Sequence, residues 1–177
     1  MRREIFLHYS FWFSFFVFVA IAEHYLSLPY WGFWLGGIIG TILPDVDHII
    51  YFYLVKPVEL TSQRFNFLLE RRQIGKMFSL LYGTRSERNE LIFHTILFQV
   101  IFFVLTFWML SSSGSLFGKG MVLAFALHLL IDQVIDLTEL GSLNNWFKDL
   151  PVTLDLAQSK IYWVVATLTT LGMGFLM

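Results

Sequence analysis

The stretch that decides the fold reads Gly36-Gly37-Ile38-Ile39-Gly40-Thr41-Ile42-Leu43-Pro44-Asp45-Val46-Asp47-His48. Its first half is apolar and rich in glycine, which is typical of a membrane helix that packs closely against a neighbour. Pro44 lacks a backbone donor, so a break or kink is expected there. Irregular backbone at membrane depth is tolerated only inside protein or beside a wet cavity. The ionisable residues that directly follow the proline therefore mark a candidate functional site.

Outward from this stretch, the composition indicates an integral membrane protein. The 177 residues are 56% hydrophobic and 14% charged, whereas soluble domains carry about 25% charged residues. Because a span needs about 20 mostly apolar residues, we expect residues 1–177 to form one all-α transmembrane bundle of about five segments, the second broken at Pro44. The predicted segments are Ile5–Ala22, Tyr30–Leu43 with its continuation Ile49–Val55, Leu91–Leu110, Met121–Leu137 and Ile161–Met177. No A-x-A cleavage pattern follows the first of these, so we expect it to be retained.

The basic residues predict the orientation of the chain. With a cytoplasmic N-terminus, every lysine and arginine except Lys119 falls on the cytoplasmic side, as the positive-inside rule requires. This pattern favours a bacterial inner membrane. Residues 56–90 then form a cytoplasmic or interfacial loop, and the alternation of arginines with apolar residues over 64–72 fits either a helix lying on anionic lipid or a solvated loop. A net charge of −1 gives no signal for nucleic acid, so membrane lipid is the expected partner.

Histidines and carboxylates gather in the predicted cytoplasmic half of four segments. The candidates are His8, Asp45, Asp47, His48, His94, His128 and Asp132, with Asp136 at the end of its segment. His128 and Asp132 are four residues apart and share a helix face. Nitrogen and oxygen ligands in a chain without cysteine suit zinc, manganese, iron or nickel, in a site of one or two ions.

Each candidate also has a purely structural interpretation. A polar pair such as His128 and Asp132 can simply hydrogen-bond across helices. Asp45 can cap the helix that starts after the proline. His24 lies at the opposite end of the first segment and is interpreted as an interfacial residue, not a ligand.

The run from Gly40 to His48 resembles the G-x-x-x-P-D-x-D-H signature of the YdjM-like family of membrane-bound, metal-dependent hydrolases of the inner membrane. His8 fits the same pattern, and His128-Leu129-Leu130-Ile131-Asp132 is similar to the family's H-L-x-x-D motif, with Gly141 following. The third family motif, H-R-G-x-T-H-S, is kept only in part: His94 matches its second histidine, and Asn89, a poor ligand, stands at the first. The resemblance extends from the first segment to about Phe147.

This family is similar to zinc-dependent phospholipases C and P1-type nucleases, so the resemblance implies phosphoester hydrolysis with one or two divalent ions, zinc first and manganese or iron as alternatives. The implied ligands are His8, Asp45, His48, His94, His128 and Asp132. Asp47 would bind a second ion or act as general base. The expected substrate is a phospholipid head group at the cytoplasmic leaflet. Two other functions stay open: a metal or proton transporter, and a non-catalytic membrane adaptor with a degenerate site, which Asn89 favours.

Overall fold

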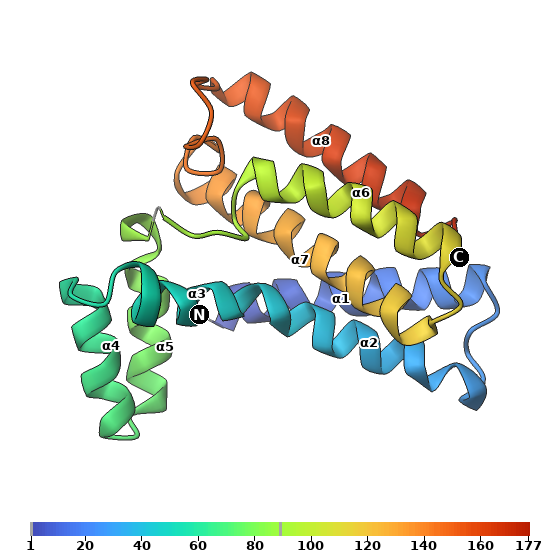
Figure 1. The fold of residues 1–177 in the computed structure, drawn as a ribbon, viewed down its shortest axis with the longest axis horizontal. Coiled ribbons are helices and arrows are strands. Elements are labelled where there is room, and N and C mark those ends of the chain that lie inside the picture. Colours follow the sequence, from blue (N-terminus) through green and yellow to red (C-terminus); the bar gives the residue numbers. More distant parts are fainter. Residues whose placement is uncertain (1, 89) are drawn as a thin grey trace.

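The computed structural model describes residues 2–88 and 90–177, without the side chains of residues 2–5, 82 and 86; this part of the chain is helical and contains no strand (Figure 1). The all-α class is therefore confirmed. The α-helices are α1 (Arg2–Ala22), α2 (Trp31–Ile42), α3 (Val46–Ile50), α4 (Leu60–Glu70), α5 (Ile74–Gly83), α6 (Ile96–Ser112), α7 (Leu116–Glu139) and α8 (Leu156–Met173). Single turns are η1 (Leu28–Tyr30), η2 (Leu43–Asp45), the π-helical η3 (Tyr51–Val55) and η4 (Arg85–Glu87).

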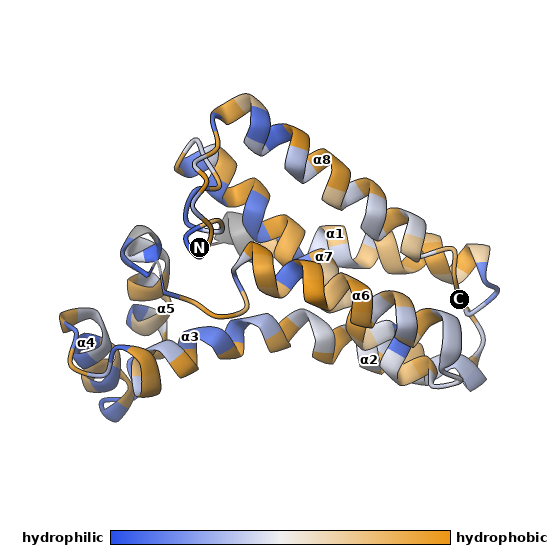
Figure 2. Cartoon of the chain, turned by 45° about the horizontal axis from the view of Figure 1, so that its top comes forward, coloured by the Kyte–Doolittle hydropathy of each residue, from blue (hydrophilic) through white to orange (hydrophobic). Residues whose placement is uncertain are grey.

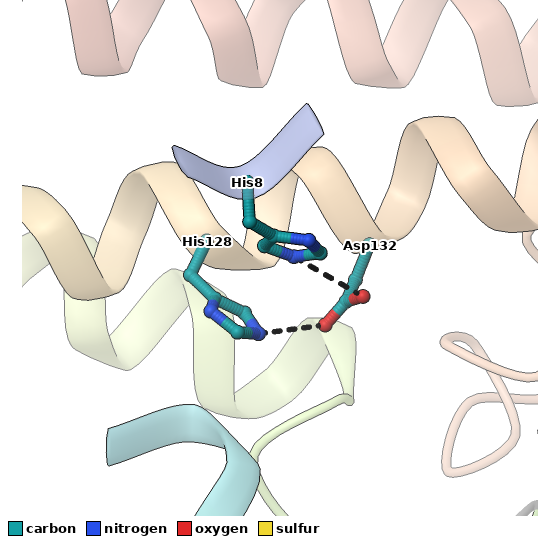
Figure 3. Close-up of side chains that lie close together, drawn as sticks. All are labelled: His8, His128 and Asp132. Atoms are coloured by element: carbon teal, nitrogen blue, oxygen red, sulfur yellow. Dashed lines mark ion pairs between the residues drawn. The ribbon is translucent and has the colours of Figure 1, made fainter. Parts of the chain in front are cut away.

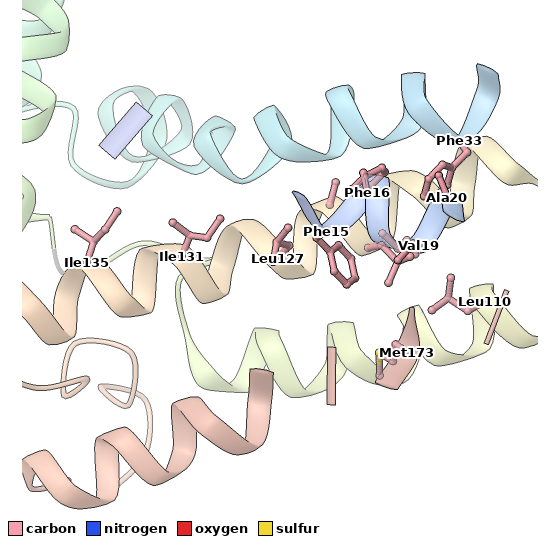
Figure 4. Close-up of a cluster of buried hydrophobic side chains, with 13 residues drawn as sticks. Phe15, Phe16, Val19, Ala20, Phe33, Leu110, Leu127, Ile131, Ile135 and Met173 are labelled. Atoms are coloured by element: carbon pink, nitrogen blue, oxygen red, sulfur yellow. The ribbon is translucent and has the colours of Figure 1, made fainter. Parts of the chain in front are cut away.

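Helix α7 forms the centre of the bundle. Helices α1, α6 and α8 run away from the end that holds the N-terminus, and α2 and α7 run back toward it (Figure 1). Every α7 side chain from Val122 to Gln133 is buried, as expected for a helix surrounded by others. Aromatic and aliphatic side chains from α1, α2, α6 and α8 close around it (Figure 4). The polar candidates on α7 therefore lie inside protein rather than against lipid.

Two helical runs are long and apolar enough to cross a membrane by length and composition, Leu28–Val55 and Leu116–Glu139. This differs from the five predicted segments. Among the described residues, Phe6–Ala22 and Ile96–Ser112 are apolar but shorter, whereas a full span takes about 20 residues. Helix α8 carries the polar residues Gln158, Ser159 and Lys160 in its first turns, which leaves a shorter apolar stretch after them.

The outward faces of α1, α6 and α8 are apolar. Figure 2 shows mainly hydrophobic colouring over α6 and much of α1, and a mixture of hydrophobic and hydrophilic colouring over α8. Phe13, Val104 and Leu168, one on each helix, are more than half exposed. Contiguous exposed apolar surface marks contact with a partner or a membrane.

The interruption expected at Pro44 is a change of helical pitch. Helix α2 ends at Ile42, η2 follows as a 3₁₀ turn, and α3 starts at Val46. Pro44 lies in the first turn of η2, where a missing N–H costs nothing. The chain then loosens into the π-helical η3. Such departures from α-helix often occur at functional sites; here η2 contains Pro44 and Asp45 of the P-D-x-D-H motif, and η3 follows the motif.

The segment predicted as a loop over 56–90 folds into a helical hairpin. Helices α4 and α5 stand at the end of the bundle where α1 begins and α3 ends (Figure 1). The Phe65 ring of α4 stacks on Phe52 of η3, with ring centroids 4.3 Å apart. Tyr51 and Leu91 complete this small core. The hairpin is thus anchored beside the P-D-x-D-H motif; its position at the membrane interface stays a prediction.

Glycines let the backbones of α2 and α7 touch. A Cβ at Gly36 would overlap the Phe117 carbonyl oxygen, and one at Gly40 would overlap the Met121 carbonyl oxygen. Gly120 faces α2 in the same way. This is the close small-residue contact of membrane helices, so the packing role predicted for Gly36 and Gly40 is confirmed.

We expect Gly40→Ala to destabilise the protein by about 1–3 kcal/mol or more, because its methyl group meets backbone that cannot turn aside. The matched control is Gly172→Ala on α8, where a Cβ meets nothing within 4 Å. Unfolding of both variants in mixed micelles with rising denaturing detergent measures the difference. Equal stability of the two variants would contradict the close α2–α7 contact.

Candidate metal centre

Three predicted ligands meet at the end of the bundle where α1 starts and α7 finishes. His128 and Asp132 lie one turn apart on α7, and His8 reaches them from α1 (Figure 3). His8 Nε2 is 3.6 Å from Asp132 Oδ1, and the His8 and His128 rings have centroids 4.3 Å apart. One ligand atom from each of the three residues lies within 4.8 Å of the other two. Sequence spacing predicted the α7 pair, and the fold adds His8.

The orientation of His128 is set by the backbone of α2. Its Nδ1 lies 2.6 Å from the Thr41 carbonyl oxygen. Because a carbonyl only accepts, Nδ1 carries a proton, and Nε2 is the ring nitrogen left to bind an ion when the ring is neutral. Nε2 is buried, has no hydrogen-bond partner, and lies 3.1 Å from Asp132 Oδ2 and 3.8 Å from Asp45 Oδ1. A histidine that donates one N–H to a carbonyl while the other nitrogen faces carboxylates has the arrangement of a metal ligand.

Asp132 is the common acceptor of the cluster. His94 Nε2 lies 2.9 Å from Oδ2, and Arg85 Nη2 donates to Oδ1 at 3.0 Å. Only 6% of the Asp132 side chain is exposed, so these partners replace the hydrogen bonds that water would donate to an exposed carboxylate. Asp132 thereby joins α1, α7, η4 and the segment before α6.

Arg85 is the functional residue that the sequence reasoning missed. It also donates through Nε to Asp136 at 2.6 Å. Burial alone would lower the pKa of Arg85, but the carboxylates of Asp132 and Asp136 raise it, so the guanidinium stays charged. The only signal in the sequence was indirect: two carboxylates one turn apart in an apolar helix require a cation. Asp136 is thus bound by Arg85 and by Trp146 Nε1.

The carboxylate of Asp47 makes its hydrogen bonds within the protein. Its carboxylate accepts the backbone N–H groups of Ile92, Phe93 and His94 at 2.6–3.3 Å, and His94 Nδ1 lies 3.0 Å from Oδ2. The side chain is 1% exposed. Asp47 therefore fixes the segment before α6 and the ring of His94. The roles of Asp47 as second-metal ligand or general base stay predictions.

The remaining candidates lie around this cluster. His94 contacts a carboxylate through each ring nitrogen, an arrangement without a lone pair for an ion. His48 stacks on His94 with ring centroids 5.4 Å apart, and its buried Nδ1 has no hydrogen-bond partner. Asp45 is 58% exposed beside His128. Asn89 lies outside the described residues. His24 follows the far end of α1, about 24 Å from His8 by helical rise.

Comparison with known families gives one match. A family model described as YdjM inner membrane protein matches residues 10–137. The matched region contains the P-D-x-D-H motif, His94 and the His128–Asp132 pair, while His8 lies just before it. No curated protein and no solved structure matches the chain.

We expect the wild-type protein to bind a divalent ion, zinc in the first instance. Because outer partners of metal ligands already contribute about 10- to 100-fold in affinity, His128→Ala and Asp132→Asn should each lose at least that much. His24→Asn, at the other end of α1, should bind like the wild type. Elemental mass spectrometry after equilibration with zinc or manganese gives the stoichiometry, with thermal unfolding as a check on folding. Equal loading of all four proteins, or none in the wild type, would contradict the site.

Proposed function

The chain belongs to the YdjM inner membrane protein family, and from this membership and its site we propose that it is a membrane-embedded, metal-dependent hydrolase that cleaves a lipid phosphoester. The observation that carries the proposal is the position of His128 Nε2, a buried ring nitrogen beside carboxylate oxygens of Asp132 and Asp45. In a neutral ring the Nε2 lone pair faces these negatively charged oxygens. A divalent cation would turn the same contact into an attractive one.

His8, His128 and Asp132 would hold the ion, and Asp45 is near enough to His128 to contribute a fourth ligand or a proton acceptor. Two nitrogens and one carboxylate oxygen, with a position left open, suit catalytic zinc. Such an ion, when bound, supplies Lewis acidity for a phosphoryl group and for water. A second ion near His48 and His94 stays a prediction.

The protein's own side chains would supply proton transfer and would position the ligands. Asp45 is exposed and lines the cavity beside the cluster, so it can take a proton from an attacking water. We assign Asp47 a positioning role, because its oxygens already accept four hydrogen bonds. Arg85 holds Asp132 and Asp136 in place. No side-chain nucleophile is required for this chemistry.

We also propose that α1, α6 and α8 lie in the bilayer beside the two longer runs, with the N-terminus in the cytoplasm. The exposed apolar faces of these three helices support this placement. The metal centre then lies at the cytoplasmic end of the bundle, where lipid head groups are within reach. Except for Lys119, the lysines and arginines belong to the start of α1, to residues 56–88 and to residues 148–160 before and at the start of α8, as the positive-inside rule requires of a cytoplasmic end.

The test is hydrolysis of phosphatidic acid, phosphatidylglycerol and phosphatidylethanolamine in mixed micelles by the zinc-loaded protein. We expect release of phosphate or of a phosphorylated head group, measured by mass spectrometry. Asp45→Asn should lower kcat by about 10²-fold or more, because it removes a proton acceptor. Asp149→Asn, an exposed carboxylate elsewhere, should leave kcat unchanged.

If the zinc-loaded wild type releases no product from any of these lipids, the proposed hydrolase activity is wrong and the non-catalytic adaptor is favoured. Activity that persists without metal and in His128→Ala would instead place the reaction elsewhere.

A further inference from the structure

A cavity of about 480 Å³ opens between the metal centre and the α4–α5 hairpin. This volume lies within the usual range of small-molecule sites, about 300–1,000 Å³. On the side of the metal centre the lining is mainly polar, with Ile42 and Ile49 of α2 and α3 among the polar groups. On the opposite side, η3, α4 and α5 contribute the apolar side chains Phe52, Phe65, Met77, Phe78 and Leu81. The cavity therefore suits a molecule with one polar and one hydrocarbon part.

Arg88 lines this cavity and lacks a matching charge. Its side chain is buried, with 6% of the residue exposed. Nη1 donates to Thr84 Oγ1 at 3.3 Å, while the buried Nε has no hydrogen-bond partner. The Phe52 ring centroid lies 5.8 Å from the guanidinium carbon. No carboxylate of the described residues lies within ion-pair distance of it.

The neighbouring Arg85 differs from Arg88 because carboxylates neutralise its charge. Arg85 is paired with Asp132 and Asp136, so its charge is balanced inside the protein. Burial and the proximity of Arg85 lower the pKa of Arg88 to about 10, which leaves it charged at neutral pH. A buried, unbalanced guanidinium costs free energy and is a strong receptor for a phosphate, which accepts two parallel hydrogen bonds from it.

We propose that the cavity binds a phosphate-bearing lipid, with Arg88 holding the phosphate and the apolar side chains of the hairpin holding the hydrocarbon chain. Taking this lipid as the substrate rests on the proposed function; the binding itself does not. Arg85 and Arg88 are three residues apart, so one short segment serves two purposes: Arg85 stabilises the metal-side carboxylates and Arg88 receives the ligand. The hairpin then acts as the wall that selects for a lipid chain.

The experiment measures binding to metal-depleted, full-length protein in dodecyl maltoside, so that no turnover is needed. The probes are hexyl phosphate, inorganic phosphate and hexanol, titrated by calorimetry. Hexyl phosphate should bind the wild type more tightly than either other probe. Because a hydrogen-bonded charge contributes about 10- to 100-fold, Arg88→Gln should weaken hexyl phosphate binding by that factor, and Arg88→Lys by less.

Two further variants complete the design. Arg71→Gln removes an exposed arginine at the end of α4 that lies over the Phe67 ring, and should bind hexyl phosphate like the wild type. Phe78→Ala removes a partly exposed cavity side chain; it should weaken hexyl phosphate binding and leave inorganic phosphate unchanged.

Unchanged hexyl phosphate binding in Arg88→Gln, or no binding to the wild type, would overturn the assignment of Arg88 as the phosphate-binding residue. If inorganic phosphate binds as tightly as hexyl phosphate, the assignment of the ligand as a lipid is wrong. If Arg88→Gln fails to fold, Arg88→Lys and Phe78→Ala still decide the question. Arg88-dependent binding in a protein that hydrolyses no lipid would keep this inference and reject the proposed function.

Discussion

The close backbone contact between α2 and α7 is the constraint on which the metal centre depends. Because Gly36, Gly40 and Gly120 carry no Cβ, the two helices approach until each backbone touches the other. At that separation the Thr41 carbonyl reaches His128 Nδ1 and fixes a proton on that nitrogen. The same approach brings Asp45 within 3.8 Å of His128. A contact made entirely of apolar residues and main chain thus determines the chemistry of a polar group.

The polar end of the bundle shows how charge is kept inside a membrane protein. Asp132 and Asp136 would each be costly if buried alone. Arg85 meets both of them from η4, outside the long helices. Asp47 is balanced differently, by three backbone N–H groups and His94. Charge pairing and main-chain donors therefore both stabilise the buried carboxylates, whereas Arg88 pairs with no carboxylate of the described residues.

Periodicity predicted the parts of the site that lie within one helix. His128 and Asp132 are four apart on α7, and the glycine face of α2 could be identified in the same way. The different environments of Asp45 and Asp47 could not be predicted in this way. Asp45 is exposed and Asp47 is buried because of the 3₁₀ turn at Pro44 and the backbone at 92–94, which are features of the folded chain. Arg85 contacts Asp132 across 47 positions, and no local pattern encodes such a distance. For the hairpin, the sequence left a helix over 64–72 and a solvated loop both open, and it did not predict α5 or the packing of the hairpin against η3.

The position of Asp132 as common acceptor has a consequence for assembly in the membrane. A chain is made from its N-terminus, so His8 is synthesised long before Asp132, the carboxylate that it contacts. Arg85 likewise precedes its two carboxylate partners, Asp132 and Asp136, by 47 and 51 positions. Helix α7 is thus the element on which the earlier polar side chains depend for their partners. The contacts at this end of the bundle are therefore complete only after α7 has been synthesised.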